Sequence, residues 1–195
     1  MIKLLEDGTI TSTPGFQAAG ICAGIKASGN RDVALIYSED PAVAAVTLTQ
    51  NRFRAAPVDL CQEYLSEEFH RAIIINSGNA NACTGEAGYQ DAVEMSKLTG
   101  KGLKIDESQV FVASTGVIGQ SMPMDKIRRG IAMIPAELSE DGGDLAAQAI
   151  MTTDLVPKEV AVEIEIEGEI VTIGGIAKGS GMIHPNMATM IAVIT

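Results

Sequence analysis

Runs of β-branched and other apolar residues recur along the chain and predict several strands. The runs are short, and polar or glycine-bearing segments separate them. Because β-branched side chains pack well on a pleated surface, runs of this length are typical of strands in a sheet. The sequence predicts such strands at residues 33–38, 44–49, 72–76 and 110–114.

Strict alternation of apolar and mainly acidic positions marks a further strand near residue 160. Successive side chains of a strand point to opposite faces, so this alternation predicts one buried face and one exposed face. Gly168 then turns the chain into a partner strand at residues 170–173. The apolar positions of the first strand are Val160, Val162, Ile164 and Ile166, and the intervening positions are Ala161, Glu163, Glu165 and Glu167.

Apolar residues at helical spacing predict three helices. Ser121 and Pro123 signal the start of one of them. Its apolar positions are Met124, Ile127, Ile131 and Ile134. A second helix runs from about Glu86 until Gly100 stops it, and a third spans residues 145–151.

The predicted strands and helices mix without a strict β-α repeat. This order favours a layered α+β sandwich with a substantial antiparallel component. No linker, repeat or low-complexity tract divides residues 1–195, so we expect a single domain. The apolar residues 190–194 read as one more strand, which would be unpaired at the end of the chain and prone to association.

Charge and composition restrict the class of partner. The 195 residues include 14 basic and 25 acidic side chains, a net charge of -11. Nucleic acids and anionic membranes are bound through clustered Lys and Arg, so neither is expected as a partner. The chain has no run of 18 apolar residues, and its start is too acidic for a signal peptide. We expect a cytoplasmic protein with small-molecule or protein partners.

Cysteine and histidine are too few for several common catalytic devices. Cys22, Cys61 and Cys83 are widely spaced, which predicts neither a disulfide scaffold nor a metal site. The two histidines, His70 and His184, leave little for a Ser-His-Asp or Cys-His mechanism. A catalytic pair of Cys83 and His184 is less favoured than a small buried thiol at Cys83.

Four polar or glycine-bearing segments follow predicted elements and are candidates for a site. Glycine-rich turns can bind phosphate through backbone N–H groups, but these segments lack the spacing of the known nucleotide-binding motifs. The segments are "NSGNANACTG" (residues 76–85), "STGVIG" (114–119), "MTTD" (151–154) and "KGSGMIHPNMATM" (178–190).

Thr189 offers a catalytic device that needs no histidine. If the Ala188–Thr189 peptide bond is broken, the new α-amine of Thr189 can act as the base for its own hydroxyl, because such an amine titrates at about 7.7–8.0. The cut would proceed by attack of the hydroxyl on the preceding carbonyl, favoured where the backbone is strained. The alternative is that Ala188 and Thr189 merely begin a strand.

The four segments in this order closely resemble the ornithine acetyltransferase family, the glutamate N-acetyltransferases of arginine biosynthesis. The resemblance covers the chain from "TPGFQAAGICAGIK" (residues 13–26) to its last residue. It implies an αββα-like sandwich, superficially similar to N-terminal-nucleophile hydrolases. It also implies a precursor cut between Ala188 and Thr189, so that residues 1–188 form an α chain and residues 189–195 begin a β chain.

The resemblance also implies roles for single residues. Thr189 is the nucleophile, and Thr115 and Gly116 form the oxyanion hole through a hydroxyl and a backbone N–H. Thr152, Lys178 and Thr189 bind substrate. Taken singly, Thr115–Gly116 could be a turn, Thr152 a helix end and Lys178 a solvated charge.

The implied reaction moves an acetyl group from N2-acetylornithine to glutamate through an acetyl-threonine ester. No metal or other cofactor is implied, and acetyl-CoA is a possible second donor. The implied partner is the β chain, in an α2β2 heterotetramer, and the fragment alone is expected to be inactive. An inactive relative and an autoprocessing aminopeptidase or amidohydrolase remain alternatives. The resemblance does not explain why the chain runs past the implied cut to Thr195.

Overall fold

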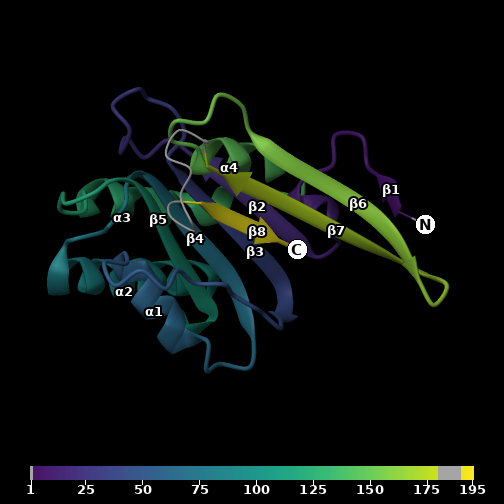
Figure 1. Ribbon diagram of the computed structural model, residues 1–195, viewed down its shortest axis with the longest axis horizontal. Helices are drawn as coiled ribbons and strands as arrows, with labels where there is room; N and C mark the ends of the chain where they lie inside the picture. The colour runs from purple at the N-terminus through teal and green to yellow at the C-terminus, as the bar shows by residue number, and fades with distance from the viewer. Residues whose placement is uncertain (1, 180–189) are drawn as a thin grey trace.

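Two four-stranded sheets and four α-helices make up the fold of this protein, as seen in a computed structural model that describes residues 2–179 and 190–195 (Figure 1). The α-helices are α1 (Ala56–Tyr64), α2 (Gly85–Leu103), α3 (Met124–Met133) and α4 (Gly143–Ile150). Three short 3-10 helices are η1 (Ile10–Ser12), η2 (Glu107–Gln109) and η3 (Ile134–Glu137).

The first sheet has the order β2-β3-β4-β5. Its strands are β2 (Phe16–Ile21), β3 (Val33–Ala42), β4 (His70–Asn79) and β5 (Val110–Val117). β2, β3 and β4 pair antiparallel, whereas β4 and β5 pair in parallel. The parallel pair is joined through α2, as a crossover connection requires. Its strands therefore end at the same edge of the sheet.

The second sheet has the order β1-β6-β7-β8, all antiparallel. Its strands are β1 (Ile2–Leu4), β6 (Lys158–Ile166), β7 (Glu169–Lys178) and β8 (Ile191–Ile194). β6 and β7 form a long hairpin that projects from the body of the molecule (Figure 1). β8 lies against β7, with Ile191 opposite Lys178.

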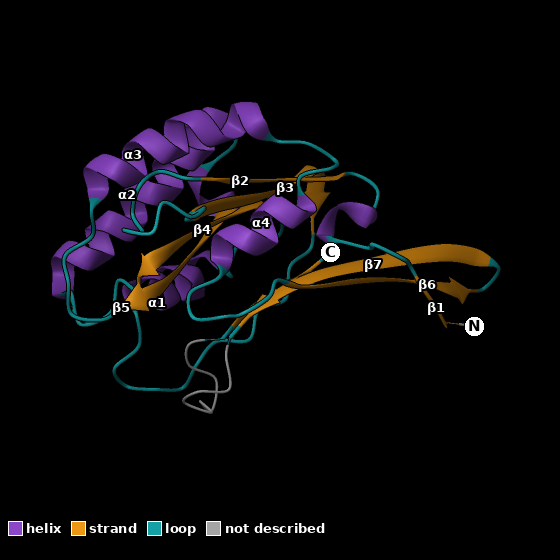
Figure 2. Cartoon of the chain, turned by 90° about the horizontal axis from the view of Figure 1, so that it is seen from above, coloured by secondary structure: helices purple, strands orange, loops and turns teal. Residues whose placement is uncertain are grey.

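Alternate residues of the first sheet enter two separate cores. Val33, Leu35 and Ile74 pack with α1, α2 and α3 on one face. Ala34 and Ile75 pack on the other face with α4 and with Ile176 and Val193 of the second sheet. This alternation places helices above and below β2–β4 (Figure 2). A mixed α+β fold with two sheets is therefore confirmed.

One face of the second sheet is apolar and open to solvent. In β6, Val160 and Ile166 are each 51% exposed, whereas Ala161, on the opposite face, is buried. Cross-strand partners share a face, which adds Val171 and Ile173 of β7, and both are more than a third exposed. The alternation predicted near residue 160 is correct, but within the described chain the Val and Ile side is open to solvent, and the other side is buried only near Ala161 and not at Glu165.

Two predictions about strands are wrong. Residues 44–49 form no strand, because no strand among the described residues lies beside this segment to pair with it, and Val43 and Val46 are exposed. The segment near residue 190 is a strand, but it is not unpaired: Ala192 and Val193 lie opposite Ala177 and Ile176 of β7.

Helix α2 continues past Gly100, where the sequence predicts its end. The helix ends at Leu103, and Lys104 adopts a left-handed conformation with φ 59° at its C-cap. Gly100 is needed for a different reason: a Cβ there would lie 3.0 Å from the carbonyl oxygen of Ile105. Gly100 therefore serves close packing against Ile105, and the left-handed residue that ends the helix is Lys104.

Candidate functional site

The parallel strands β4 and β5 bring two candidate residues to one edge of the first sheet. Thr115 lies opposite Ser77, and Gly116 lies opposite Gly78. Thr115 is 1% exposed. Gly116 has φ 135°, and a Cβ at this position would lie 2.4 Å from the carbonyl carbon of Gly78. The two strands approach so closely here that only glycine fits.

Buried asparagines of "NSGNANACTG" hold this edge in place. The Asn76 side chain donates to the carbonyl of Asn79 at 2.9 Å and accepts a hydrogen bond from Ser114 at 2.6 Å. Asn79 donates to the carbonyls of Gln120 and Ser121, at 3.2 and 3.0 Å. Since a buried polar side chain is costly unless it is hydrogen-bonded, these contacts fix the loops beyond β4 and β5. This motif therefore supports the site structurally.

Lys178, the last residue of β7, brings the second sheet to this edge. Its Nζ donates a hydrogen bond to Oγ1 of Thr115 at 3.1 Å, and the lysine is only 4% exposed. Burial lowers the pKa of Lys178, Asp154 opposes that shift, and Lys158 reinforces it. The fold thus joins two predicted site residues that are 63 positions apart in sequence.

Thr152 lies in the turn that follows α4, and Asp154 organises this turn. One carboxylate oxygen of Asp154 accepts the backbone N–H of Thr152 at 3.2 Å. The other accepts Nζ of Lys158 at 2.5 Å and the backbone N–H of Gly179 at 2.8 Å. The Asp154 side chain has no exposed surface. Through Gly179 it connects the "MTTD" turn to the residue that follows Lys178.

Lys26 is a further cation near Lys178 that sequence reasoning did not single out. Its Nζ donates to the carbonyls of Arg31 and Ala149, at 2.6 and 3.4 Å. Burial lowers the pKa of Lys26, while Asp32 and Asp154 oppose the shift. The only available signal was its place at the end of "TPGFQAAGICAGIK". The cations around this edge suit a carboxylate-bearing ligand.

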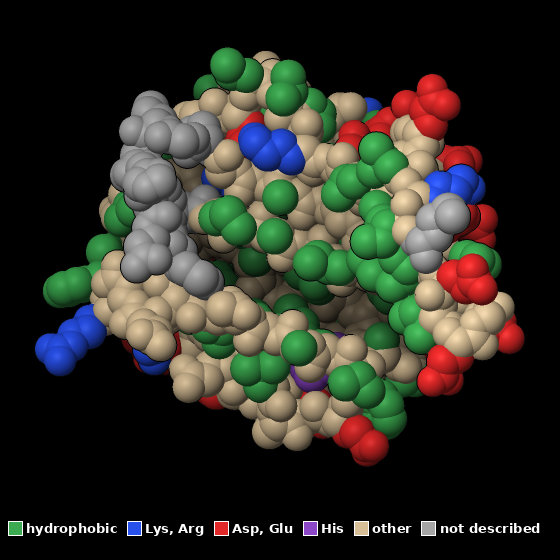
Figure 3. Space-filling view, turned by 45° about the vertical axis from the view of Figure 1, so that its right-hand side comes forward, with side chains coloured by type: hydrophobic (Ala, Val, Ile, Leu, Met, Phe, Trp, Pro, Cys, Tyr) green, Lys and Arg blue, Asp and Glu red, His purple; other side chains and the backbone are tan. Residues whose placement is uncertain are grey.

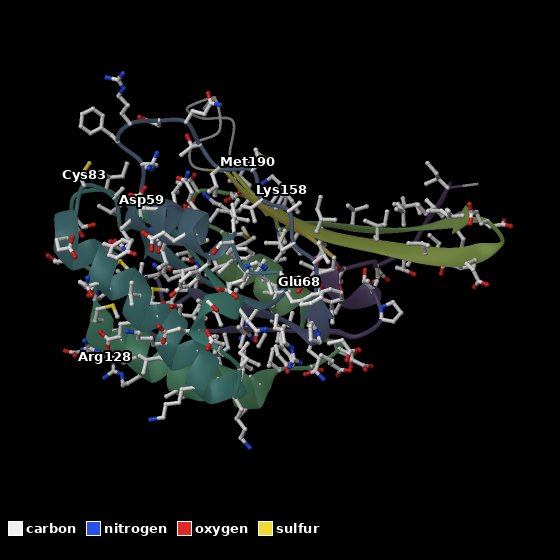
Figure 4. The ribbon with its side chains drawn as sticks, turned by 90° about the horizontal axis from the view of Figure 1, so that it is seen from below. Asp59, Glu68, Cys83, Arg128, Lys158 and Met190 are labelled. Carbon is white, nitrogen blue, oxygen red and sulfur yellow. The ribbon has the colours of Figure 1, made fainter. Side chains whose placement is uncertain are left out.

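The remaining candidate residues are those of the proposed cleavage site, His184 and the cysteines. Ala188, Thr189 and His184 lie outside the described residues. Cys83 is exposed, near the start of α2 (Figure 4), so the prediction of a buried thiol there is wrong. Cys61 is the buried cysteine, and burial raises its pKa to about 11, which makes it unreactive at neutral pH.

Other kinds of site find no support in the part of the chain that the structure describes. No group of three or more His, Cys, Asp or Glu side chains among residues 2–179 and 190–195 is arranged to hold a metal ion. No helix within these ranges is both long and apolar enough to cross a membrane. A hollow of about 920 Å³ beside η1 and β1 contains the carboxylates of Asp144 and Glu159, but none of the predicted site residues lines it.

Curated relatives match nearly the whole of this chain. The arginine biosynthesis bifunctional protein ArgJ of Synechocystis sp. is 55% identical over 190 residues, which is 97% of this chain and 46% of the relative. The protein of the same name from Dehalococcoides mccartyi is 50% identical over 196 residues, which is 100% of this chain and 48% of the relative. The chain therefore spans about half the length of these relatives.

Two solved structures share the fold. The ArgJ protein of Bacillus halodurans is 42% identical with a TM-score of 0.89, and the match covers 98% of each chain. The ornithine acetyltransferase of Mycobacterium tuberculosis, solved in complex with ornithine, is 43% identical with a TM-score of 0.89; the match covers 98% of this chain and 100% of the other. The model of the ArgJ family matches residues 17–195. The chain belongs to the ArgJ family.

Proposed function

We propose that this chain is the N-terminal half of a self-cleaving enzyme that transfers an acetyl group from N2-acetylornithine to glutamate in arginine biosynthesis. We expect it to act in the cytoplasm. Membership of the ArgJ family supports the class of reaction. The structural observation that carries the proposal is the buried hydrogen bond from Lys178 to Thr115, beside the tightly constrained Gly116.

Self-cleavage comes first in this proposal. The hydroxyl oxygen of Thr189 attacks the carbonyl carbon of Ala188, and the C–N bond between the two residues breaks to leave an ester. The hydroxyl proton passes to the departing nitrogen, so this step already frees the α-amine of Thr189. Water then hydrolyses the ester, which releases the carboxylate of Ala188 and restores the hydroxyl of Thr189. This amine then has the pKa of an ordinary chain terminus and can take the proton of the neighbouring hydroxyl at neutral pH.

Acetyl transfer then takes two steps. Oγ of Thr189 attacks the acetyl carbonyl of N2-acetylornithine, and the oxyanion accepts hydrogen bonds from the Thr115 hydroxyl and the Gly116 N–H. The C–N bond breaks, the ornithine amine takes the proton, and an acetyl ester remains on Thr189. The amine of glutamate attacks this ester, the C–O bond breaks, and the Thr189 oxygen takes the proton that the amine loses. N-acetylglutamate leaves, and the Thr189 hydroxyl is restored.

Charge at the site supports this choice of substrates. Both carry an α-carboxylate, for which Lys178 is the proposed binding partner, and Thr152 is a second proposed substrate-binding residue. The Lys178 ammonium also orients the Thr115 hydroxyl, because an ammonium can only donate and the oxygen must accept. The hydroxyl proton of Thr115 then remains available for the oxyanion.

Substitution of Thr189 tests the central claim. Thr189→Ala in the full-length protein should give one uncut polypeptide without acetyl transfer, since both steps need the hydroxyl. Gel electrophoresis and transfer of labelled acetyl from acetylornithine to glutamate measure the two properties. Acetyl-CoA belongs in the same assay, because the relatives are named bifunctional. An alanine variant that is still cut, or a wild-type enzyme that only hydrolyses acetylornithine, would exclude the proposal.

The open apolar face of the second sheet supports a further part of the proposal. We expect the C-terminal half of the protein to cover this face, because the relatives are about twice as long as this chain and a large exposed apolar surface marks an interface. Hydrophobic side chains also gather on the face drawn in Figure 3. The two halves should co-purify after the cut, as an α2β2 heterotetramer. Native mass spectrometry tests this arrangement.

A further inference from the structure

We propose that Asp154 is a positioning residue that holds the Lys178–Gly179 end of β7 in the geometry needed for self-cleavage and acetyl transfer. The inference rests on the proposed function and adds to it a residue for which the family resemblance implies no role. Asp154 touches neither the Thr115 hydroxyl nor Lys178 through any hydrogen bond that the structure describes. Its hydrogen bonds reach the backbone on either side of the site, and its charge also raises the pKa of Lys178.

The contacts of Asp154 join two segments that are distant in sequence. One oxygen accepts the N–H of Thr152 at 3.2 Å, and the other accepts the N–H of Gly179 at 2.8 Å, 25 residues further on. Gly179 directly follows Lys178, the lysine hydrogen-bonded to Thr115. One carboxylate therefore fixes both the turn that carries Thr152 and the end of the strand that carries Lys178.

Asp154 is a buried carboxylate, and both of its oxygens accept hydrogen bonds. Its side chain has no exposed surface, and a buried charge without partners would be strongly destabilising. Burial on its own would raise the pKa of Asp154, but hydrogen bonds from Lys158, Gly179 and Thr152 outweigh it and lower the pKa to about 2. The group is therefore a carboxylate throughout the neutral range. Hydrogen bonds from backbone N–H groups to such a carboxylate are stronger than those to a neutral oxygen.

The position of Gly179 relates these contacts to the proposed cut. Gly179 begins the connection from β7 to β8, and Ile191 returns opposite Lys178. A Cβ on Gly179 would lie 3.4 Å from Cγ of Met190, so the two ends of the connection are neighbours. Lys158 and Met190 also lie at the same end of the second sheet (Figure 4). Displacement of a reacting group by about 1 Å can cost two orders of magnitude in rate, so an anchor at Gly179 matters for chemistry nearby.

Asp154→Asn separates positioning from packing, because the side chain keeps its shape. An amide has one acceptor oxygen, so in either orientation one of the two backbone N–H groups, of Thr152 or of Gly179, faces an NH2 group. Loss of a buried hydrogen bond to a charged group corresponds to a rate loss of about 10- to 100-fold. We expect cleavage of the full-length precursor, made by cell-free synthesis and followed on gels, to slow by this factor. In protein that has been cut, kcat should fall more than KM rises.

Lys158→Met is the matched control. It removes the ion pair with Asp154 but leaves both backbone contacts, and Lys158 is 44% exposed. We expect cleavage within about threefold of wild type, because both backbone N–H groups that position the carboxylate remain bound to it. If Lys158→Met slows cleavage as much as Asp154→Asn, the ion pair and not the backbone anchor is responsible, and the inference is wrong.

Asp154→Glu is a second variant that tests the position of the carboxylate if Asp154→Asn does not fold. Glutamate retains the charge but moves the oxygens by one methylene, so cleavage should slow although the charge remains. Wild-type rates of cleavage in folded Asp154→Asn or Asp154→Glu protein, with only a lower melting temperature, would overturn the inference. Such a result beside an uncut Thr189→Ala protein would refute the role of Asp154 alone, whereas a cut Thr189→Ala protein would refute the proposed function.

Discussion

Gly116 allows a quantitative test of the crowding between β4 and β5. An alanine at this position would place its Cβ 2.4 Å from the carbonyl carbon and 2.7 Å from the carbonyl oxygen of Gly78. Both are backbone atoms in the neighbouring strand, so no side chain can rotate away. The φ of 135° is also a conformation that residues with a Cβ rarely adopt. Gly116→Ala therefore combines backbone strain with a steric clash.

The expected loss of stability follows from these two costs. Backbone strain of this kind costs about 1–3 kcal/mol, and overpacking of a tight site adds about 1–3 kcal/mol. A total of about 4 kcal/mol corresponds to a fall in melting temperature of roughly 8–16 °C in a chain of this length. The displaced strand would also move the Thr115 hydroxyl away from Lys178.

Gly119→Ala is the control for Gly116→Ala. Gly119 has φ 78°, but a Cβ there would meet no atom within 4 Å. Only the conformational cost of about 1–2 kcal/mol remains, or roughly 2–8 °C. Thermal unfolding followed by circular dichroism measures both variants. If their melting temperatures agree within 2 °C, the clash with Gly78 is not real and our account of this edge of the sheet fails.

Two further predictions concern the hydroxyl of Thr115 and a pair of carboxylates. Thr115→Ala should lower kcat by about 100-fold with little change in KM, because the lost donor acts in the transition state; a change mainly in KM would remove Thr115 from the oxyanion hole. Burial and the neighbouring Asp144 raise the pKa of Glu159 from 4.5 to about 7. The folded state therefore holds this proton more tightly than the unfolded state, so the stabilisation is complete below pH 4.5 and is lost as the pH rises to 7. Glu159→Gln should thus raise the melting temperature more at pH 8 than at pH 5, and an equal effect at both pH values would contradict this.

The strands of the first sheet could be predicted because both of their faces are buried. Val33, Leu35 and Ile74 enter one core, and Ala34 and Ile75 enter the other, which gives continuous apolar runs. Residues 44–49 are also apolar and contain β-branched residues, but no strand among the described residues pairs with them, and composition alone does not reveal that difference. Tertiary context decides the outcome for such a segment.

The short elements α1 and β1 are not predicted from the sequence, because few residues in each carry a hydrophobic pattern. Helix α1 has nine residues and buries only Pro57, Leu60 and Cys61. Pro57 in its first turn is a residue typical of helix starts, but a single proline does not predict a helix. β1 has three residues, all exposed on the chain described, and pairs with β6 from 160 positions away. No local pattern predicts a pairing across that distance.

The candidate site shows a similar limit. Thr115, Gly116, Thr152 and Lys178 were predicted from the resemblance to a family, one residue at a time. Their spatial relation was not predictable, because the contact between Lys178 and Thr115 depends on how the second sheet docks on the first. Asp154 lies within "MTTD", but the sequence predicts no role for it, since its proposed role depends on Gly179, a partner from another part of the chain. The roles of all these residues stay predictions until they are measured.

The pairing of β7 with β8 has a consequence for the protein after the proposed cut between Ala188 and Thr189. Four pairs of residues join the two strands, and Thr195 adds two backbone hydrogen bonds to Gly174. β7 precedes the Ala188–Thr189 bond in sequence and β8 follows it, so breaking that bond leaves the contacts between the two strands in place. Before the cut, folding is a unimolecular process; afterwards, the two pieces of an unfolded molecule must find each other again. The cut protein should therefore refold at a rate that depends on its concentration. The lifetime of its folded state should be set by the rate of unfolding.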